Sequence, residues 1–550
     1  MRKFVFLMFL CSSMLQAQEH AWVYFKDKPN AQTYLSNPLS MLSQRAIDRR
    51  NRQNISITTQ DVPVDETYVS SVKNSNGIEV KAISKWLNAV HVFGLETNIA
   101  NLQNLTSVDS IQFANKNLAV INTSTSKLSK VFKINKFDDE VISIYNYGEA
   151  TNQTEMLGVE KFHQVNIKGQ GIQIAIIDAG FYGVNTARAF AHLLDNDEAN
   201  GEILGGYDFV NNSEDFYINT GTTHGTQVLS TIAAIKENEF VGTAPKASFY
   251  LFVTEDDANE TPLEESLWVQ AAERADSLGV DIINISLGYS EFDENKYNYT
   301  YADMDGETTF ITRGANIAAQ KGMVLVNSMG NSGNDTWHYL TAPADAKNII
   351  SVGAVDANEN MVSFSSFGPS ADNRIKPETL AQGGSVFVVN EENQVGISNG
   401  TSFSGPIIAG AVACLWQAYP EKSSLEIRQM VIENSKDYLN PTDQRGFGVL
   451  NVDALVPQFS VDFRDPIPPF YILSNYSNKV IYVQFNESQM NELTGDLIIQ
   501  IFSLTGAILE NKIMTKNDNK IDYSSYATGL YFMRYSYMGK SKLISLYKKD

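Results

Sequence analysis

The sequence predicts an α/β protein with a mostly parallel sheet and helices on both faces, preceded by a small α+β domain and followed by a small all-β sandwich. Between residues 148 and 456, short runs rich in Val and Ile alternate with segments whose apolar residues follow helical spacing. Uninterrupted apolar strands separated by helices are typical of a parallel sheet that is covered on both faces. At 550 residues the chain is also too long for a single core.

The first 17 residues have the layout of a secretory signal peptide, with Arg2 and Lys3 before an apolar run that ends in small or polar residues near Ala17. We expect cleavage after Ala17, because the segment is too short to serve as a permanent membrane helix. No other apolar run is long enough to cross a bilayer. Cleavage also removes Cys11, so Cys414 remains alone and no intramolecular disulfide is expected.

The flanking regions differ in pattern from the middle of the chain. Residues 18–113 mix strand-like alternation in "AWVYFKD" and "AVHVFGLE" with helical spacing in "NIANLQNL", which predicts the α+β domain. We interpret the basic stretch "SQRAIDRRNRQ" within it as a solvated helix face. Residues 114–147 are polar and irregular and predict a linker. Residues 457–550 alternate apolar and polar residues between Gly and Asn turns, which predicts the β-sandwich.

Composition limits the classes of partner. The formal net charge of −21 argues against a nucleic-acid partner, because binding phosphates requires a basic surface. A hydrophobic content of 43% with 19% charged residues is that of a soluble globular protein.

Three stretches of the middle region each offer one group suited to nucleophilic catalysis. An apolar strand runs directly into Asp178, His224 opens the segment "HGTQVLSTIAA", and Ser402 stands in "NGTSFSGP" before an apolar helix. Each alone has an ordinary explanation, namely a turn aspartate, a surface histidine and a helix N-cap. Together they are the carboxylate, base and nucleophile of a serine hydrolase, in the order Asp, His, Ser.

The three motifs resemble those of the subtilisin family of serine proteases. "IIDAG" is similar to the aspartate motif of the family, "HGTQV" to its histidine motif and "GTSFSGPIIAG" to its serine motif. The resemblance implies a subtilisin-like fold and a catalytic triad of Asp178, His224 and Ser402, with Ser404 the weaker candidate for nucleophile. Ala179 stands where the family usually has Ser or Thr, so one hydrogen bond to Asp178 is expected to be missing.

Two further segments extend the resemblance. "NSMGNSGND" is similar to the oxyanion motif, which implies that Asn331 donates a hydrogen bond to the tetrahedral intermediate alongside the Ser402 N–H. Outside that context the segment would be an ordinary Asn-Ser-Gly turn. "NISLGYS" resembles the strand that pairs with extended substrate. The resemblance places Ser286, Leu287 and Gly288 in the cleft and Gly330 on the facing wall of the specificity pocket.

The flanking regions resemble other parts of secreted subtilisins. Residues 18–113 are similar to an inhibitory propeptide, which implies a zymogen with its processing site in the linker. Residues 457–550, with "IFSLTGAILENK" and "YATGLYFMRYSYMGKSKLISLYKK", resemble the C-terminal sorting domain of type IX secretion in Bacteroidetes. The resemblance implies a secreted or cell-surface protein whose partners are protein or peptide substrates, its own propeptide and the type IX secretion machinery.

The leading hypothesis is a secreted serine endopeptidase, a hydrolase acting through an acyl-enzyme. A catalytically inactive subtilisin fold used for binding or adhesion is the main alternative, although all three triad residues and Asn331 are present. An α/β-hydrolase esterase would need Gly where Ser404 stands and the order Ser, Asp, His. Metal-dependent hydrolysis lacks both an HExxH motif and a cysteine cluster.

No cofactor is required for triad chemistry. Structural calcium is compatible with the acidic stretches "DNDEANGE" and "TEDDANE". Neither stretch has EF-hand spacing, so the sequence assigns no metal ligand.

Overall fold

The computed structural model describes residues 18–118, 145–195 and 201–456. In the C-terminal region it describes 470–475, 480–485, 497–503, 507–515, 518–527, 529–537 and 540–548. The expected signal peptide and residues 119–144 of the expected linker, where processing is expected, lie outside the described residues.

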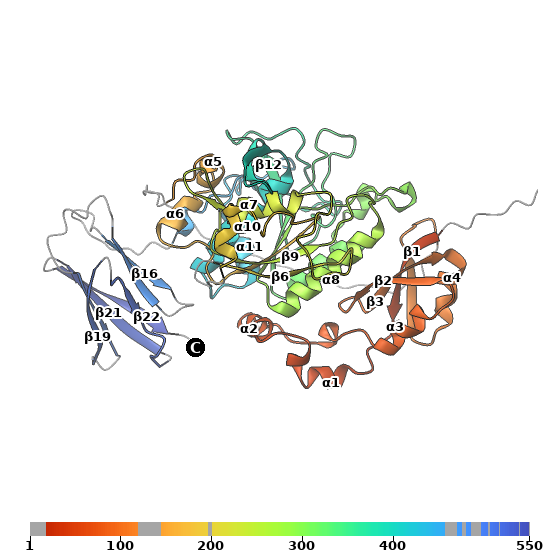
Figure 1. Cartoon of the computed structure of the whole chain (residues 1–550), viewed down its shortest axis with the longest axis horizontal. Coiled ribbons are helices and arrows are strands. Elements are labelled where there is room, and N and C mark those ends of the chain that lie inside the picture. Colours follow the sequence, from red (N-terminus) through yellow and green to blue (C-terminus); the bar gives the residue numbers. More distant parts are fainter. Residues whose placement is uncertain are drawn as a thin grey trace, which may run out of the picture.

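A parallel sheet forms the centre of the middle domain (Figure 1). It has seven strands in the order β13-β12-β11-β10-β5-β9-β6. The predicted parallel α/β fold is confirmed. The chain enters the sheet at β5 and adds strands first on one side and then on the other. A crevice is expected beyond the carboxyl end of β5, where the order reverses. The strands are β5 (Gln173–Asp178), β6 (Ile203–Asp208), β9 (Ser248–Val253), β10 (Ile282–Ile285), β11 (Val324–Ser328), β12 (Ile350–Val355) and β13 (Thr379–Gln382).

Helices cover both faces of this sheet. On one face, α7 (His224–Ala233), α10 (Thr401–Ala418) and α11 (Ser424–Glu433) share a core with β5, β9 and β12. On the other face, α8 (Pro262–Leu278) and α9 (Phe310–Gln320) share a second core with β10 and β11. Helix α8 begins at a capping box between Thr261 and Glu264 and ends at Gly279, whose φ of 93° suits a glycine. The shorter elements of this domain are α5 (Thr151–Glu155), α6 (Val159–Gln164), β7 (Ile235–Lys236), β8 (Phe240–Val241), β14 (Val386–Val389) and β15 (Val395–Ser398).

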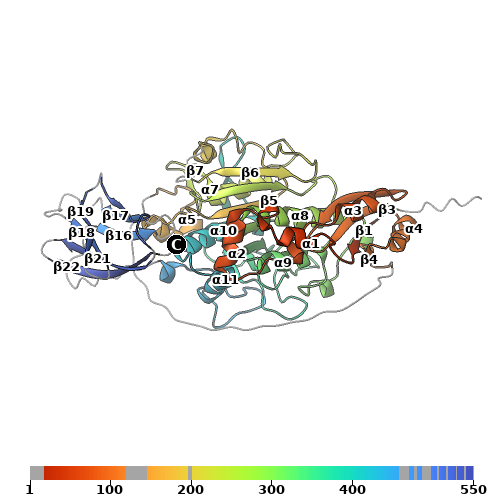
Figure 2. The ribbon, with the colours of Figure 1, turned by 90° about the horizontal axis from the view of Figure 1, so that it is seen from below.

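The N-terminal domain is a four-stranded antiparallel sheet, in the order β2-β3-β1-β4, that lies against α8 (Figures 1 and 2). Trp22 on β1 joins the second core of the middle domain, stacking on Phe310 with 4.7 Å between ring centroids. Its indole N–H donates to Ser266 Oγ on α8 at 2.8 Å. The elements are β1 (Gln18–Phe25), α1 (Ala31–Leu35), α2 (Gln44–Arg52), α3 (Glu66–Lys73), β2 (Ile78–Ser84), β3 (Ala89–Leu95), α4 (Glu96–Asn101) and β4 (Val108–Phe113).

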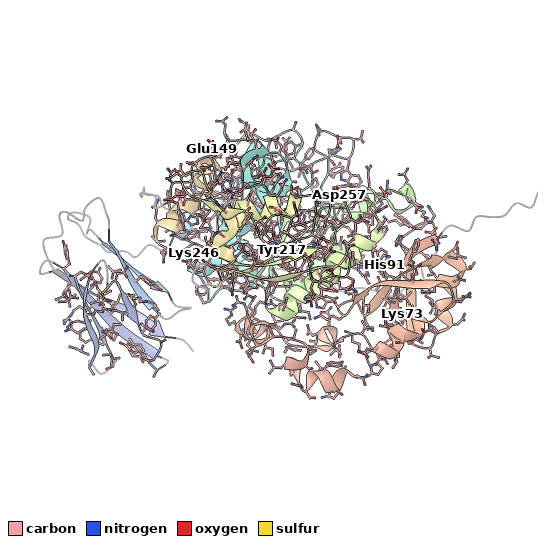
Figure 3. All side chains as sticks on the ribbon, viewed as in Figure 1. Lys73, His91, Glu149, Tyr217, Lys246 and Asp257 are labelled. Atoms are coloured by element: carbon pink, nitrogen blue, oxygen red, sulfur yellow. The ribbon has the colours of Figure 1, made fainter. Side chains whose placement is uncertain are left out.

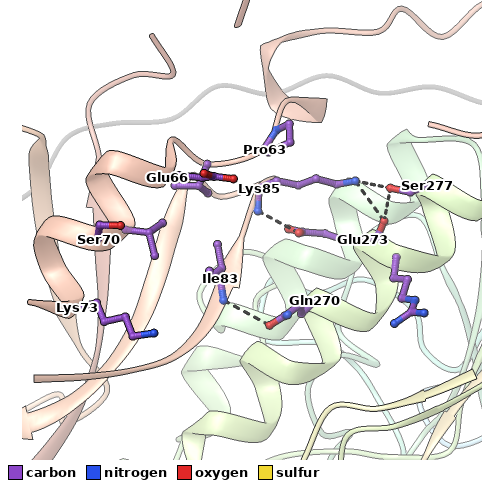
Figure 4. A pocket seen from close by; sticks show the side chains of 12 residues that line it. Pro63, Glu66, Ser70, Lys73, Ile83, Lys85, Gln270, Glu273 and Ser277 are labelled. Carbon is purple, nitrogen blue, oxygen red and sulfur yellow. Dashed lines mark hydrogen bonds between the residues drawn. The ribbon is translucent and has the colours of Figure 1, made fainter. Parts of the chain in front are cut away.

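Polar contacts to one buried carboxylate fix the N-terminal domain on α8 (Figure 4). Glu273 accepts from the Ser84 hydroxyl at 2.6 Å, from the Trp86 N–H at 2.9 Å and from the Lys85 N–H at 3.0 Å. The Lys85 ammonium reaches Ser277 Oγ at 2.5 Å. Beside these contacts, residues of both domains line a pocket of about 580 Å³.

The interpretation of the basic stretch as a solvated helix face is wrong. It forms α2, in which Arg49 and Arg50 are fully buried. Arg49 donates to Asp276 and to the Val280 carbonyl, while Arg50 bridges Asp276 at 2.6 Å and Asp61 at 2.8 Å. Burial of these guanidinium groups is tolerated because each is paired with a carboxylate.

The C-terminal region consists of two antiparallel sheets, β16-β17-β20 and β19-β18-β21-β22, around their own core, as predicted. Among the described residues, no helix combines the length and apolar character needed to cross a membrane. The strands are β16 (Phe470–Asn475), β17 (Val480–Phe485), β18 (Leu497–Phe502), β19 (Ile508–Met514), β20 (Lys520–Asp522), β21 (Gly529–Tyr537) and β22 (Lys540–Lys548).

Candidate active site

Asp178 and His224 are in direct contact at the carboxyl edge of the sheet. Asp178 is the last residue of β5 and is fully buried, while His224 is the first residue of α7. Asp178 Oδ1 lies 2.7 Å from His224 Nδ1 and also accepts from the Ala179 N–H at 2.8 Å. This contact assigns the proton to Nδ1 and leaves Nε2 of His224 free to act as a base.

The electrostatics of His224 reflect two opposed effects. Burial alone would lower the pKa of the imidazole, because the charged form loses hydration. The carboxylate of Asp178 and its hydrogen bond outweigh that loss and raise the pKa above 6.5. An imidazolium formed during catalysis is therefore stabilised at this position.

The second oxygen of Asp178 has no hydrogen-bond partner among the described residues. Ala179 follows it and offers only a backbone N–H, which Oδ1 already accepts. This agrees with the expected loss of one hydrogen bond at Asp178. A buried carboxylate oxygen without a hydrogen bond keeps the free-energy cost of its desolvation. Asp178 is therefore fixed by fewer hydrogen bonds than an aspartate whose two oxygens are both paired.

Ser402 lies in the first turn of α10, two residues after Gly400, whose φ of 147° strongly favours glycine. Its hydroxyl donates to the Ser286 carbonyl at 3.4 Å, and the structure records no hydrogen bond from it to His224. The ring of the next residue, Phe403, lies 5.8 Å from the His224 ring. The N–H groups of this first turn have no partner within the helix, which favours negative charge at its N-terminus.

Pro406 leaves the backbone carbonyl of Ser402 without a hydrogen bond inside α10. A proline inside α10 has no N–H to donate to the carbonyl four residues earlier, which is that of Ser402. That carbonyl instead accepts from the Ser286 hydroxyl at 2.9 Å. Ser286 therefore holds the start of α10 against the end of β10.

Asn331 is held next to Ser402 by its amide oxygen. Its Oδ1 accepts from the Thr401 N–H at 2.9 Å and from the Thr401 hydroxyl at 3.0 Å. Because a backbone N–H can only donate, this contact fixes which end of the amide is oxygen. The exposed Asn331 thus keeps its NH₂ group available to an incoming oxygen.

The residues expected to line the cleft lie around this site. Leu287 and Gly288 follow β10, and Tyr289 pairs with Ala342 through N–H···O bonds of 2.8 and 3.0 Å. Gly330 precedes Asn331 and has a φ of 105°. The structure thus brings together all eight residues named from the sequence: Asp178, His224, Ser402, Asn331, Ser286, Leu287, Gly288 and Gly330.

Sequence reasoning found only part of an acidic cluster that follows β9. Carboxylate oxygens of Glu255, Glu260 and Glu264 lie within 4.8 Å of one another. Burial raises the pKa of each group, so protonation relieves their repulsion. Tyr289 donates to Glu255 at 2.6 Å, and the Thr261 N–H donates to Glu264 at 3.0 Å. The stretch "TEDDANE" contains only two of the three residues, since Glu264 comes from α8.

Comparison with known proteins decides the family. Residues 169–449, just over half of the chain, match the subtilase family of peptidases. The chain belongs to the subtilase family. It is a subtilisin-like serine endopeptidase. Residues 20–130 match the peptidase S8 propeptide domain of Bacteroidota, and residues 475–547 match a secretion-system C-terminal sorting domain.

Individual relatives each match just over half of this subtilase. Subtilisin DY of Bacillus licheniformis is 29% identical over 301 residues, covering 54% of this chain and 96% of that protein. Subtilisin E of Bacillus subtilis is 29% identical over 294 residues, covering 53% of this chain and 67% of that protein. Among solved structures, MycP1 with its N-terminal propeptide removed is 20% identical with a TM-score of 0.45, covering 57% of this chain and 98% of that one.

Proposed function

We propose that this subtilase hydrolyses peptide bonds through Ser402 as nucleophile, His224 as general base and Asp178 as the group that orients and stabilises His224. The observation that carries the proposal is the 2.7 Å contact between His224 Nδ1 and Asp178 Oδ1, with Ser402 at a helix N-terminus on the same edge of the sheet.

The proposed mechanism uses only side chains and backbone groups of this chain. Ser402 Oγ attacks the substrate carbonyl and transfers its proton to His224 Nε2, forming a tetrahedral intermediate. The Asn331 amide and the Ser402 N–H stabilise its oxyanion. The imidazolium then protonates the leaving amine, and water hydrolyses the acyl-enzyme by the reverse sequence. We propose no cofactor for this chemistry and only a structural role for calcium, with no ligands assigned.

Hydrolysis of an internally quenched peptide by the processed chain tests the proposal. We expect cleavage that a fluorophosphonate abolishes, because the reagent esterifies an activated serine. Cleavage that persists after stoichiometric labelling would contradict the role of Ser402. An intact peptide and an unlabelled chain would favour the alternative of a binding or adhesion module.

We propose the following division of the chain. Residues 1–17 are the signal peptide, 18–113 the inhibitory propeptide, 114–147 the linker with the processing site, 148–456 the catalytic domain and 457–550 the sorting domain. Support for the propeptide comes from its family match and its extensive packing on α8. The chain is then made as a zymogen that its own N-terminal domain inhibits.

Two histidines make the attachment of this propeptide sensitive to acid. His91, which Figure 3 labels, lies between the N-terminal sheet and α8. His20 Nδ1 lies 2.8 Å from His91 Nε2, and His91 Nδ1 lies 2.7 Å from Ser266 Oγ on α8. A hydrogen bond between two imidazoles needs one donor and one acceptor, so it is lost when both rings are protonated. Burial lowers the pKa of His20 to about 4, helped by repulsion from Lys296 and Lys81 and opposed by attraction from Glu294. Burial also lowers the pKa of His91 well below 6.5, and repulsion from His20 and Lys81 lowers it further.

Propeptide binding should therefore weaken as the pH falls from 6.5 towards 4. In the free propeptide each histidine has a pKa near 6.5, whereas in the bound propeptide its pKa is lower. Acid therefore favours the free, protonated propeptide, and the affinity for the catalytic domain falls across this pH range. We expect the dissociation constant of the processed complex to rise by roughly 10² between pH 7 and pH 4.5. Measuring retention of the propeptide by gel filtration tests this, with His20→Gln/His91→Gln as control. An equal acid response in that variant would contradict the role of the pair.

The C-terminal sorting domain indicates secretion or attachment to the cell surface. We propose the type IX secretion machinery as the partner that recognises it. A chain ending at Val456 should keep its peptidase activity but remain inside the cell envelope of its host, measured by fractionation. Normal export of this shortened chain would refute the sorting role.

A further inference from the structure

The N-terminal domain contacts the catalytic domain at a second place, far from the candidate active site. Helix α2 lies against the C-terminal end of α8, whereas the N-terminal sheet contacts α8 nearer its start, at Ser266 and Glu273. Asp281, which α2 contacts, directly precedes β10, and Ser286 directly follows that strand. At about 3.3 Å per residue, roughly 16 Å of strand separates the two positions. Helix α2 therefore docks at the edge of the sheet opposite to Ser402.

The last turn of α8 receives hydrogen-bond donors from the start of α2. A helix leaves its last carbonyl groups without a partner inside the helix. The Ser43 N–H donates to the Ser277 carbonyl at 2.8 Å, and the Ser43 hydroxyl donates to the Leu278 carbonyl at 2.9 Å. Arg45 Nε donates to the Gly279 carbonyl at 3.1 Å. The N-terminal domain thus completes the hydrogen bonding at this end of α8.

Two buried carboxylates beside this turn bind guanidinium groups of α2. Asp276 is fully buried, and it pairs with Arg49 through one oxygen and with Arg50 through the other. Asp281 is 2% exposed and pairs with Arg45. A buried charge is tolerated only when it is paired, so both carboxylates require a cation while α2 covers them.

We propose that the end of α8, with Asp276 and Asp281, is an arginine-binding exosite that keeps the propeptide bound after the linker is cut. An exosite here means a binding site outside the active-site cleft. Cleavage in the linker frees the C-terminal end of the propeptide but leaves every contact of α2 in place. Dissociation of α2, and not cleavage, then limits the appearance of free enzyme. This inference rests on the proposed zymogen, since it assumes that the N-terminal domain inhibits the enzyme until it leaves.

The test measures how fast the propeptide leaves the processed full chain. Chains that carry Ser402→Ala are cut in the linker by an added protease, so that self-digestion cannot speed the release. The complex is diluted at pH 7.5, where the His20–His91 pair is neutral, and the bound propeptide is followed by gel filtration. We expect Arg49→Met/Arg50→Met to raise the dissociation rate by roughly 10² or more, because Asp276 then stays buried without a cation in the complex.

Arg52→Met is the matched control on the same helix. The Arg52 side chain is 52% exposed and lies 3.8 Å from Asp281, so its loss should change the dissociation rate by less than about threefold. Arg45→Met replaces the double variant if that one fails to fold, since the Arg45 side chain is 37% exposed. We expect it to raise the rate by roughly tenfold. A folded Arg49→Met/Arg50→Met or Arg45→Met complex that dissociates no faster than Arg52→Met would overturn the inference.

Peptidase activity separates the exosite from the inhibitory role of the propeptide. In processed chains that retain Ser402, activity should appear as the propeptide leaves, and sooner in Arg49→Met/Arg50→Met than in Arg52→Met. Full activity before any propeptide is released would refute the proposed zymogen. Faster release in the double variant would still support the exosite in that case.

Discussion

Replacing Ser402 by alanine should lower turnover of a peptide substrate by roughly 10⁶, a magnitude taken from subtilisin itself. The substitution removes the only atom that the mechanism allows to attack the carbonyl. Residual hydrolysis should come from substrate binding and the oxyanion donors alone. Steady-state kinetics on chains processed by the same added protease measure the effect without relying on self-processing.

This loss should occur without unfolding. In the structure Ser402 Oγ makes a single long hydrogen bond of 3.4 Å to Ser286, so its removal should change stability by less than about 0.5 kcal/mol. Thermal unfolding of the Ser402→Ala chain checks this. A fully folded variant that retains turnover within tenfold of the wild type would contradict the assignment of Ser402.

Replacing Asn331 by alanine should lower kcat by roughly 10² to 10³ and leave KM nearly unchanged. The magnitude is again that measured for such a donor in subtilisin. An oxyanion donor interacts most strongly when the substrate oxygen carries charge, so its loss raises the barrier without weakening ground-state binding. The variant should still be acylated at Ser402 by an activated ester, because the nucleophile and its base remain.

Thr401→Val provides a control for the second role of Asn331. The structure shows that Asn331 also accepts two hydrogen bonds from Thr401, so Asn331→Ala removes structural contacts as well. Thr401→Val removes one of these contacts and leaves the Asn331 NH₂ group in place. We expect it to lower the melting temperature with a much smaller loss of kcat. Equal losses of kcat in both variants, or unchanged turnover in Asn331→Ala, would rule out the oxyanion role.

The fold could be predicted because its signals are local in sequence. Each strand of the central sheet is a short apolar run, and the helices between them keep helical spacing. The candidate site could be named because Asp178 ends a strand, and His224 and Ser402 lie in the first turn of a helix, each within a short motif. Parallel strands then bring such positions to one edge of the sheet.

The features that escaped prediction depend on contacts between distant segments. The buried Arg49 and Arg50 both pair with Asp276, which lies more than 220 residues away near the end of α8. No periodicity within α2 reveals that partner, and an isolated basic helix is normally solvated.

The central claim is that Asp178 and His224 activate Ser402, and mapping the site of fluorophosphonate attachment by mass spectrometry tests it most directly. On the processed wild-type chain, the account predicts one adduct, on the peptide that contains Ser402. The adduct should form far more slowly in His224→Ala and be absent in Ser402→Ala. An adduct on Ser404 or another residue, or labelling that survives the loss of Ser402, would contradict the account.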